Sequence, residues 1–358
     1  MSRDTVCRAA AIALTGVQGT AIMVEAAVSQ QLQGMTIIGL PDTALAEAKL
    51  RVRSATTQAG LPLSNRFITV NLSPAALPKH GAGFDLAIAL AALAASRRLP
   101  PERLSETAHL GELALGGELR RPAGLLSSTV AARRLGFRRV MVPAECAAEA
   151  ALVPGIEVVP VADLGEAVGW YRGGGNSLQL QRSHLEPSRP QSSHPRGSHS
   201  RGSHPRGSHP QEPGREPGPH LEALVLPGES GDRAEDMSEI IGQPEAVEAL
   251  VIAAAGRHHL SLLGPPGAGK TLLATRLPTL LPPLTDSEAI EASSIASLGG
   301  TALTRLIRRP PFESPHHTSS TAAIIGGGSG NVVRPGAVTR AHHGVLLMDE
   351  ARDGKCTF

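Results

Sequence analysis

The stretch LSLLGPPGAGKT, residues 260–271, decides the fold of the second half of this chain. It joins a short apolar run, residues 260–263, to a glycine-rich loop that ends in a Lys-Thr pair. An apolar run typical of a helix follows over residues 272–281. A strand, a loop of the form G-x-x-x-x-G-K-[ST] and a helix in this order predict a phosphate-binding loop within an α/β fold. An ordinary Gly-Pro turn would explain neither flank.

Such a loop binds phosphate through its backbone and two side chains. Glycines let the N–H groups turn inward around phosphate oxygens, and the N-terminus of the next helix adds its positive dipole end. Lys270 would place a cation near the β- and γ-phosphates, while the Thr271 hydroxyl would bind Mg²⁺. ATP and Mg²⁺ are therefore the predicted cofactors. The predicted binding residues are Gly264, Pro265, Pro266, Gly267, Ala268, Gly269, Lys270 and Thr271.

A second element with the right form for this chemistry is HGVLLMDE, residues 343–350. An apolar strand that ends in two acids is typical of a Walker B element, in which Asp349 would hold Mg²⁺ and Glu350 would polarise the attacking water as the catalytic residue. About 80 residues separate the two elements, which leaves room for an intervening strand and helix. Residues 238–243 precede a helix with an apolar face, and we expect this segment to close over an adenine.

The chain divides at residues 173–220, where Gly, Ser, Pro, His and Arg dominate and Arg-Gly-Ser-His recurs three times. This composition offers too little apolar surface to offset the entropy of ordering, so we predict a disordered linker. Its histidines lack a fixed geometry, which favours disorder over a metal role. The linker separates an N-terminal block, residues 1–172, from a C-terminal block, residues 221–358.

The N-terminal block also has α/β patterning. Alternation over residues 67–72 predicts a strand, and an apolar stripe that starts behind Asp42 predicts a helix that ends before Gly60. Residues 85–96 are apolar on nearly every side and predict a buried helix. Short apolar runs at residues 140–142 and 158–161 predict further strands.

Composition narrows the functional classes. The 34 Lys and Arg residues nearly balance 32 Asp and Glu residues, so no global field indicates nucleic acid, and only seven aromatic residues are available for base stacking. Cys7, Cys146 and Cys356 are scattered, which excludes a disulfide framework. The sequence contains neither a signal peptide nor a membrane-length apolar run, and we expect a cytoplasmic protein without membrane contact.

Three pairs of adjacent histidines, at 258/259, 316/317 and 342/343, raise the question of zinc. Adjacent residues on a strand point to opposite faces, and the pairs lack the i, i+4 spacing that brings two imidazoles together on a helix. We therefore expect local turn or interface roles for them.

The motifs together resemble the YifB/ComM subfamily of magnesium-chelatase-like AAA+ ATPases. In the C-terminal block the likeness rests on Ile240 to Gln243, the loop Gly264 to Thr271, Phe312 to His317, Gly326 to Gly328 and Ala341 to Glu350. In the N-terminal block it rests on Ile38 to Asp42, Arg51 to Ala55, Val70 to Pro74, Leu77 to Gly81, Phe84 to Leu86 and Gly111 to Leu115. The resemblance implies an α+β N-terminal domain with a Lon-protease-like fold and a P-loop AAA+ domain.

The Lon-like resemblance does not extend to peptidase chemistry. The position that corresponds to the nucleophilic serine is Gly83, and the position of the partner lysine is Leu126. A Ser-Lys mechanism needs both groups, so we predict no proteolysis. By resemblance, this domain serves assembly or substrate contact.

The subfamily resemblance also implies a hexameric ring that acts on DNA, as in branch migration by ComM proteins. After Glu350, however, relatives continue through Leu-Pro-Glu-Phe, whereas this chain reads ARDGKCTF over residues 351–358. We expect a truncated chain that lacks the sensor, arginine finger and lid and hydrolyses ATP poorly alone. One alternative is a nucleotide-binding assembly module that another chain completes. Another is the ATPase subunit of tetrapyrrole metal insertion.

Overall fold

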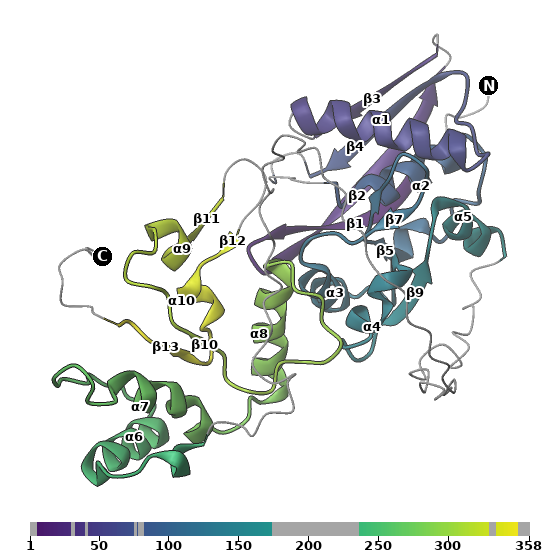
Figure 1. Ribbon diagram of the computed structural model, residues 1–358. Helices are drawn as coiled ribbons and strands as arrows, with labels where there is room; N and C mark the ends of the chain where they lie inside the picture. The colour runs from purple at the N-terminus through teal and green to yellow at the C-terminus, as the bar shows by residue number, and fades with distance from the viewer. Residues whose placement is uncertain are drawn as a thin grey trace, which may run out of the picture. The chain divides into compact units, whose positions relative to one another are not determined.

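The computed structural model describes residues 6–29, 33–39, 42–74, 77, 82–173, 236–328 and 334–349 (Figure 1). The predicted linker lies outside the described residues from residue 174 onward. The division of the chain at residues 172 and 221 therefore stays a prediction.

A seven-stranded sheet forms the centre of the N-terminal block (Figure 1). Its strand order is β3-β4-β2-β1-β5-β8-β9. The pairs β1–β2 and β2–β4 are antiparallel, and the other four pairs are parallel. The strands are β1 (Cys7–Thr15), β2 (Gln18–Ser29), β3 (Gly34–Ile38), β4 (Phe67–Ser73), β5 (Thr107–His109), β8 (Arg139–Pro143) and β9 (Glu157–Val161), and the hairpin β6 (Glu112–Leu113) with β7 (Leu119–Arg120) stands apart.

Both faces of this sheet are covered, as its alternating side chains require. Met141 of β8 belongs to one apolar core, while its neighbours Val140 and Val142 belong to the other. Helices α1, α2 and α5 contribute to the first core, and helices α3 and α4 contribute to the second. The helices are α1 (Asp42–Gln58), α2 (Asp85–Ala95), α3 (Leu125–Arg134), α4 (Ala147–Ala150) and α5 (Leu164–Arg172).

The elements predicted for this block are confirmed. Strands β4, β8 and β9 contain the three predicted runs, and α2 is buried from Asp85 to Ala94. Helix α1 begins at Asp42 and ends at Gln58, just before Gly60. The expected capping contact of the Asp42 side chain lies outside the described side chains.

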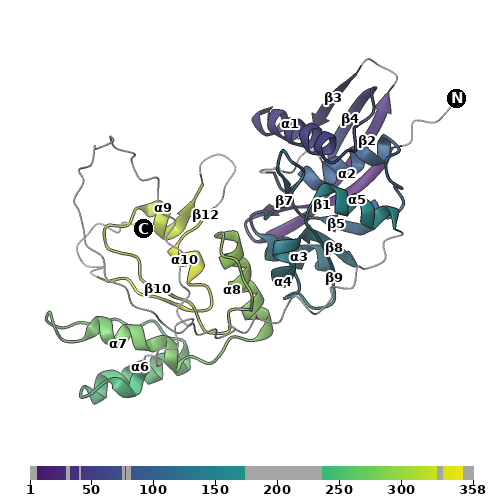
Figure 2. The same cartoon turned by 45° about the vertical axis from the view of Figure 1, so that its right-hand side comes forward.

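The C-terminal block is helical with short strand ladders (Figure 2). A parallel ladder joins β10 to β13, and an antiparallel ladder joins β11 to β12. The elements are α6 (Pro244–Gly256), α7 (Lys270–Arg276), α8 (Asp286–Leu298), β10 (Phe312–Glu313), α9 (Thr321–Ile325), β11 (Gly326–Gly327), β12 (Arg334–Pro335), α10 (Ala337–Arg340) and β13 (Val345–Leu346), with 3-10 turns at Met237–Glu239 and Leu277–Leu280.

Two sequence predictions for this block need correction. Residues 260–263 do not form a strand, and the predicted strand before Asp349 is reduced to Val345–Leu346. A strand needs a neighbouring strand to bond its backbone N–H and C=O groups. Among the described residues, the β10–β13 ladder consists of two residue pairs, and residues 260–263 do not join it. The predicted helix over residues 272–281 is α7 followed by a 3-10 turn.

Helix α8 is hydrogen-bonded to helices of the N-terminal block through serine side chains. The Ser297 hydroxyl accepts from the Leu126 amide at 3.2 Å and donates to the buried Glu149 carboxylate at 2.6 Å. The Ser127 hydroxyl donates to the Ser294 carbonyl at 3.2 Å. Glu149 is also paired with Arg121. The contacts with Ser297 and Arg121 offset the cost of burying the Glu149 carboxylate.

Among the described residues, every helix is too short or too polar to cross a bilayer.

A buried histidine links the sheet to the last helix of the N-terminal block. Nδ1 of His109 lies 2.8 Å from the Ala10 carbonyl oxygen, and Nε2 lies 2.7 Å from the Tyr171 hydroxyl. A carbonyl only accepts, so Nδ1 carries the proton and Nε2 accepts from the tyrosine. Burial lowers the pKa of His109 to about 4, and the residue is neutral at physiological pH.

This depressed pKa predicts a loss of stability in mild acid. In the unfolded chain His109 is protonated below about pH 6.5, whereas in the folded chain it stays neutral down to about pH 4. The free energy of unfolding therefore decreases as the pH falls from about 6.5 to about 4. Between pH 7 and pH 5 the loss is about 2 kcal/mol. The His109→Asn variant has no histidine to protonate at this position, so its free energy of unfolding should not show this loss. As the pH falls from 7 to 5, the difference in free energy of unfolding between the unsubstituted chain and the variant should decrease by about 2 kcal/mol. Parallel pH profiles in denaturant titrations would contradict the prediction.

Candidate functional site

The loop before α7 adopts the backbone that its glycines predict. Gly267 and Gly269 have φ values of +80° and +78°, a region that L side chains rarely adopt. Gly269 occupies the N-cap position of α7, and Lys270 is the first residue of the helix. The loop therefore delivers its Lys-Thr pair directly onto a helix N-terminus, where amide groups lack intrahelical partners.

Lys270 and Thr271 point to different partners. The Lys270 ammonium donates to the carbonyl oxygens of Gly264 at 3.0 Å and Pro265 at 2.9 Å. The Thr271 hydroxyl donates to a carboxylate oxygen of Asp349 at 3.2 Å. The two residues predicted to bind Mg²⁺, 78 positions apart in the chain, are thus in direct contact. Glu350, the predicted catalytic residue, lies outside the described residues.

Gln243 fixes the outer edge of the loop. It precedes α6 in a left-handed conformation with φ +54°, and its side-chain amide donates to the Ala268 carbonyl at 2.8 Å. The motif Ile240 to Gln243 was identified in the sequence, but this contact was not expected. Ile241 is 97% exposed beside it, which leaves an apolar side chain open to a ligand or a partner.

A small apolar core packs next to the loop, between α6 and α7. Leu250 of α6 and Leu273 of α7 are buried together with Met237, and Leu262 packs against them. Leu263 is 67% exposed, so the residues before the loop contribute one side chain to the core and leave others uncovered.

The position of Asp349 depends on the β10–β13 ladder. Phe312 pairs with Val345, and the Leu347 amide donates to the Glu313 carbonyl at 2.8 Å. Arg340 donates to both carboxylate oxygens of Glu313, at 3.0 and 2.8 Å. Such a bidentate pair fixes orientation as well as distance. Sequence reasoning missed this pair, because nothing in the spacing of residues 313 and 340 indicates a contact.

The two positions that would carry peptidase chemistry contain no reactive group. Gly83 has no hydroxyl, and Leu126 is fully buried with its amide bonded to Ser297. The absence of proteolysis stays a prediction. The preceding residues 78–81 lie outside the described part of the chain.

Comparisons with known proteins agree over most of the chain. The family described as magnesium chelatase, subunit ChlI, matches residues 236–356, and a second family, subunit ChlI of Mg-chelatase, matches residues 24–146. The chain is 38% identical to the uncharacterised protein YifB of Escherichia coli and 36% identical to the competence protein ComM of Haemophilus influenzae, over 94% of its length in both cases. It is 30% identical to the Lon protease of Rhizobium meliloti over 169 residues, which are 44% of this chain and 21% of that protein.

The chain spans 58% of the length of YifB and of ComM. The mixed α/β architecture, with its sheet of mostly parallel strands, agrees with these relationships. The fold class predicted from the sequence is therefore confirmed.

Gly344 provides a test of how the ladder positions Asp349. A methyl group at this residue would overlap backbone atoms of Pro311, which accepts a hydrogen bond from the Val345 amide at 2.8 Å. We expect Gly344→Ala to destabilise the C-terminal block by about 1–3 kcal/mol. Gly327→Ala is the control, because its added methyl would make an ordinary contact of 3.5 Å with Ala322. Thermal unfolding with limited proteolysis measures both, and equal stability of the two variants would contradict the prediction.

Gln243→Asn tests the support of the loop. Asparagine tolerates the left-handed backbone, but its amide is one methylene too short to reach Ala268. The loss of one hydrogen bond of about 0.5–1.5 kcal/mol should weaken the nucleotide binding that the sequence predicts for this loop about 2- to 10-fold, measured with a fluorescent ATP analogue. Glu245→Gln, a change in the first turn of the same helix, should leave the affinity unchanged. An unaltered affinity in Gln243→Asn would show that the contact is dispensable.

Proposed function

Because this chain belongs to the magnesium-chelatase-like family of YifB and ComM, we propose that it binds MgATP at the loop Gly264 to Thr271 and works in nucleotide-driven remodelling of DNA. The observation that carries the nucleotide part is the hydrogen bond from Thr271 to Asp349. A hydroxyl and a carboxylate that meet beside a P-loop are the oxygen ligands that a phosphate-bound Mg²⁺ requires.

The residues of the loop have separable roles in this proposal. Backbone amides from Gly267 to Thr271 would surround the phosphate oxygens. The ammonium of Lys270, which now donates to the carbonyls of Gly264 and Pro265, would turn to the β- and γ-phosphates. Thr271 and Asp349 would hold Mg²⁺, which would neutralise charge on the phosphates. Glu350 would orient water in hydrolysis.

The DNA part of the proposal rests on similarity to the competence protein ComM over 94% of the chain. The matching families carry the name of a chelatase subunit for both blocks, so the presence of the N-terminal block does not separate DNA remodelling from tetrapyrrole metal insertion. Assembly into a ring, as AAA+ proteins form, belongs to the same proposal. With few aromatic residues, DNA contact would depend mainly on local basic patches.

Substitutions in the loop test nucleotide binding. Lys270→Ala removes charge-assisted hydrogen bonds of about 1.5–3 kcal/mol and should weaken MgATP binding at least about 10-fold in a titration with a fluorescent analogue. Thr271→Val should abolish the gain in affinity that Mg²⁺ provides. Thr275→Val is the matched control, because its hydroxyl donates within α7 to the Leu272 carbonyl at 2.8 Å. Saturable binding that Lys270→Ala leaves intact would refute the proposed site.

A four-way DNA junction tests the second part separately. We expect the chain to bind a fluorescent junction more tightly than a linear duplex of the same sequence, measured by anisotropy at one fixed salt concentration. Equal affinities would reject DNA remodelling and leave nucleotide binding standing.

A further inference from the structure

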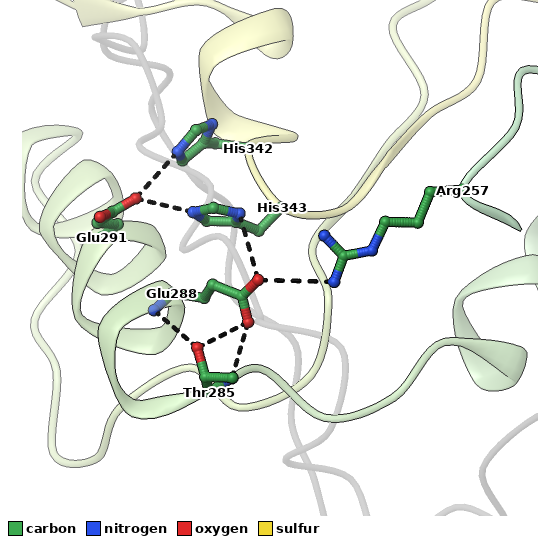
Figure 3. A network of polar contacts seen from close by, with 6 residues as sticks. All are labelled: Arg257, Thr285, Glu288, Glu291, His342 and His343. Carbon is green, nitrogen blue, oxygen red and sulfur yellow. Dashed lines mark hydrogen bonds and ion pairs between the residues drawn. The ribbon is translucent and has the colours of Figure 1, made fainter. Parts of the chain in front are cut away.

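A cluster of two histidines and two glutamates lies outside the nucleotide loop, between α8 and the turn that precedes β13 (Figure 3). Ligand atoms of Glu291, His342 and His343 all lie within 4.8 Å of one another. Within the described part of the chain, this is the single group of three or more His, Cys, Asp or Glu side chains that meets this geometry.

The local backbone makes two adjacent histidines face the same way. His343 has a left-handed conformation with φ +60° in the turn after α10, so the alternation expected for a strand does not apply. The two rings are 3.9 Å apart between centroids. Nε2 of His342 lies 3.3 Å from Oε2 of Glu291, and Nε2 of His343 lies 2.8 Å from the same oxygen. Both rings thus approach one carboxylate oxygen, although adjacent residues of a strand would point to opposite faces.

The opposite edge of the His343 ring also faces a carboxylate. Nδ1 of His343 lies 3.9 Å from Oε1 of Glu288, one helical turn before Glu291 on α8. Glu288 is held by a capping box in which it accepts from the Thr285 amide at 2.9 Å and from the Thr285 hydroxyl at 2.8 Å. Arg257 approaches the same carboxylate at 3.6 Å. Histidines that bind metals through one ring nitrogen commonly direct the other at such a carboxylate.

Stability does not account for this cluster. The side chains of Glu291 and His342 are 45% and 48% exposed, and ion pairs at such positions contribute little to folding. The same exposure that weakens the ion pairs gives a solvated ion direct access.

We propose that Glu291, His342 and His343 bind a divalent transition metal ion of the zinc class. Imidazole nitrogens favour zinc, nickel or copper over Mg²⁺, which prefers oxygen ligands. Tetrahedral zinc with bonds of about 2.0–2.2 Å holds its ligands about 3.3 Å apart. The two nitrogens lie 3.3 and 2.8 Å from Oε2, and all three ligand atoms are within 4.8 Å of one another. Water completes the coordination, and Glu288 orients His343.

The bound ion would join α8 to the turn that leads into β13. His343 lies two residues before the strand, and Asp349 follows the strand. The ion would therefore restrain the segment that brings Asp349 to Thr271. This site does not depend on the proposed function, because its ligands are separate from the nucleotide loop.

Zinc titration tests the site in a full chain from which the histidines at positions 184–220 have been removed. Six further histidines, at positions 184, 194, 199, 204, 209 and 220, are removed as competing ligands, so the background is the full chain with these residues changed to Ser. In calorimetry we expect one zinc ion per chain with a dissociation constant in the micromolar range or below. X-ray absorption should report two imidazoles and oxygen ligands without sulfur, which excludes binding by cysteine.

Single substitutions assign the ligands in the same background. His342→Ala, His343→Ala and Glu291→Gln should each weaken zinc binding at least 10-fold, and Glu291→Gln retains a hydrogen-bond acceptor for both rings. The double variant His316→Ala/His317→Ala is the matched control and should bind zinc as the background does. The rings of His316 and His317 are 4.0 Å apart, but among the described residues they belong to no group of three ligand side chains. Circular dichroism and thermal unfolding of every variant verify folding. Absent zinc binding, or affinity equal to the background in Glu291→Gln, would overturn the proposal.

Discussion

The candidate site of the C-terminal block depends on the contact between Thr271 and Asp349. This contact joins the start of α7 to the end of the segment that contains β13, across 78 positions of sequence. Local structure positions each of the two residues for this contact. On one side, two glycines in left-handed conformations set the loop, and on the other the Arg340–Glu313 pair orients the short ladder. A hydroxyl and a carboxylate at the surface would gain little from meeting alone, so their contact follows from the backbone that positions them.

Helix α8 connects this contact to the rest of the described chain. Its Ser297 is hydrogen-bonded to Leu126 and Glu149, while its Glu291 faces the histidines that precede β13. One helix thus carries two sets of contacts on residues about two turns apart. The same helix therefore contacts both the N-terminal block and the turn that leads to the segment of Asp349.

Sequence patterns predicted the parts of the structure whose causes are local. Alternation identified β4, and the continuous apolar run identified α2, because burial on one or both faces leaves a direct trace in composition. The glycine-rich loop was also predictable, since φ values such as that of Gly269 strongly favour glycine. Residues 260–263 were wrongly predicted as a strand, because apolar character does not reveal whether a neighbouring strand is present. The Arg340–Glu313 pair and the Glu291 cluster arise from tertiary approach, and a single sequence contains no signal for them.

The carbonyl oxygens that hold Lys270 have a consequence for which anions the loop accepts. An incoming ligand must replace two hydrogen bonds to Gly264 and Pro265 before it gains the ammonium. A singly charged anion offers little more than these two dipoles, whereas a polyphosphate offers several charged oxygens at once. Binding of an anion through Lys270 therefore requires the exchange of both hydrogen bonds, which favours a ligand with several charged oxygens over a singly charged one.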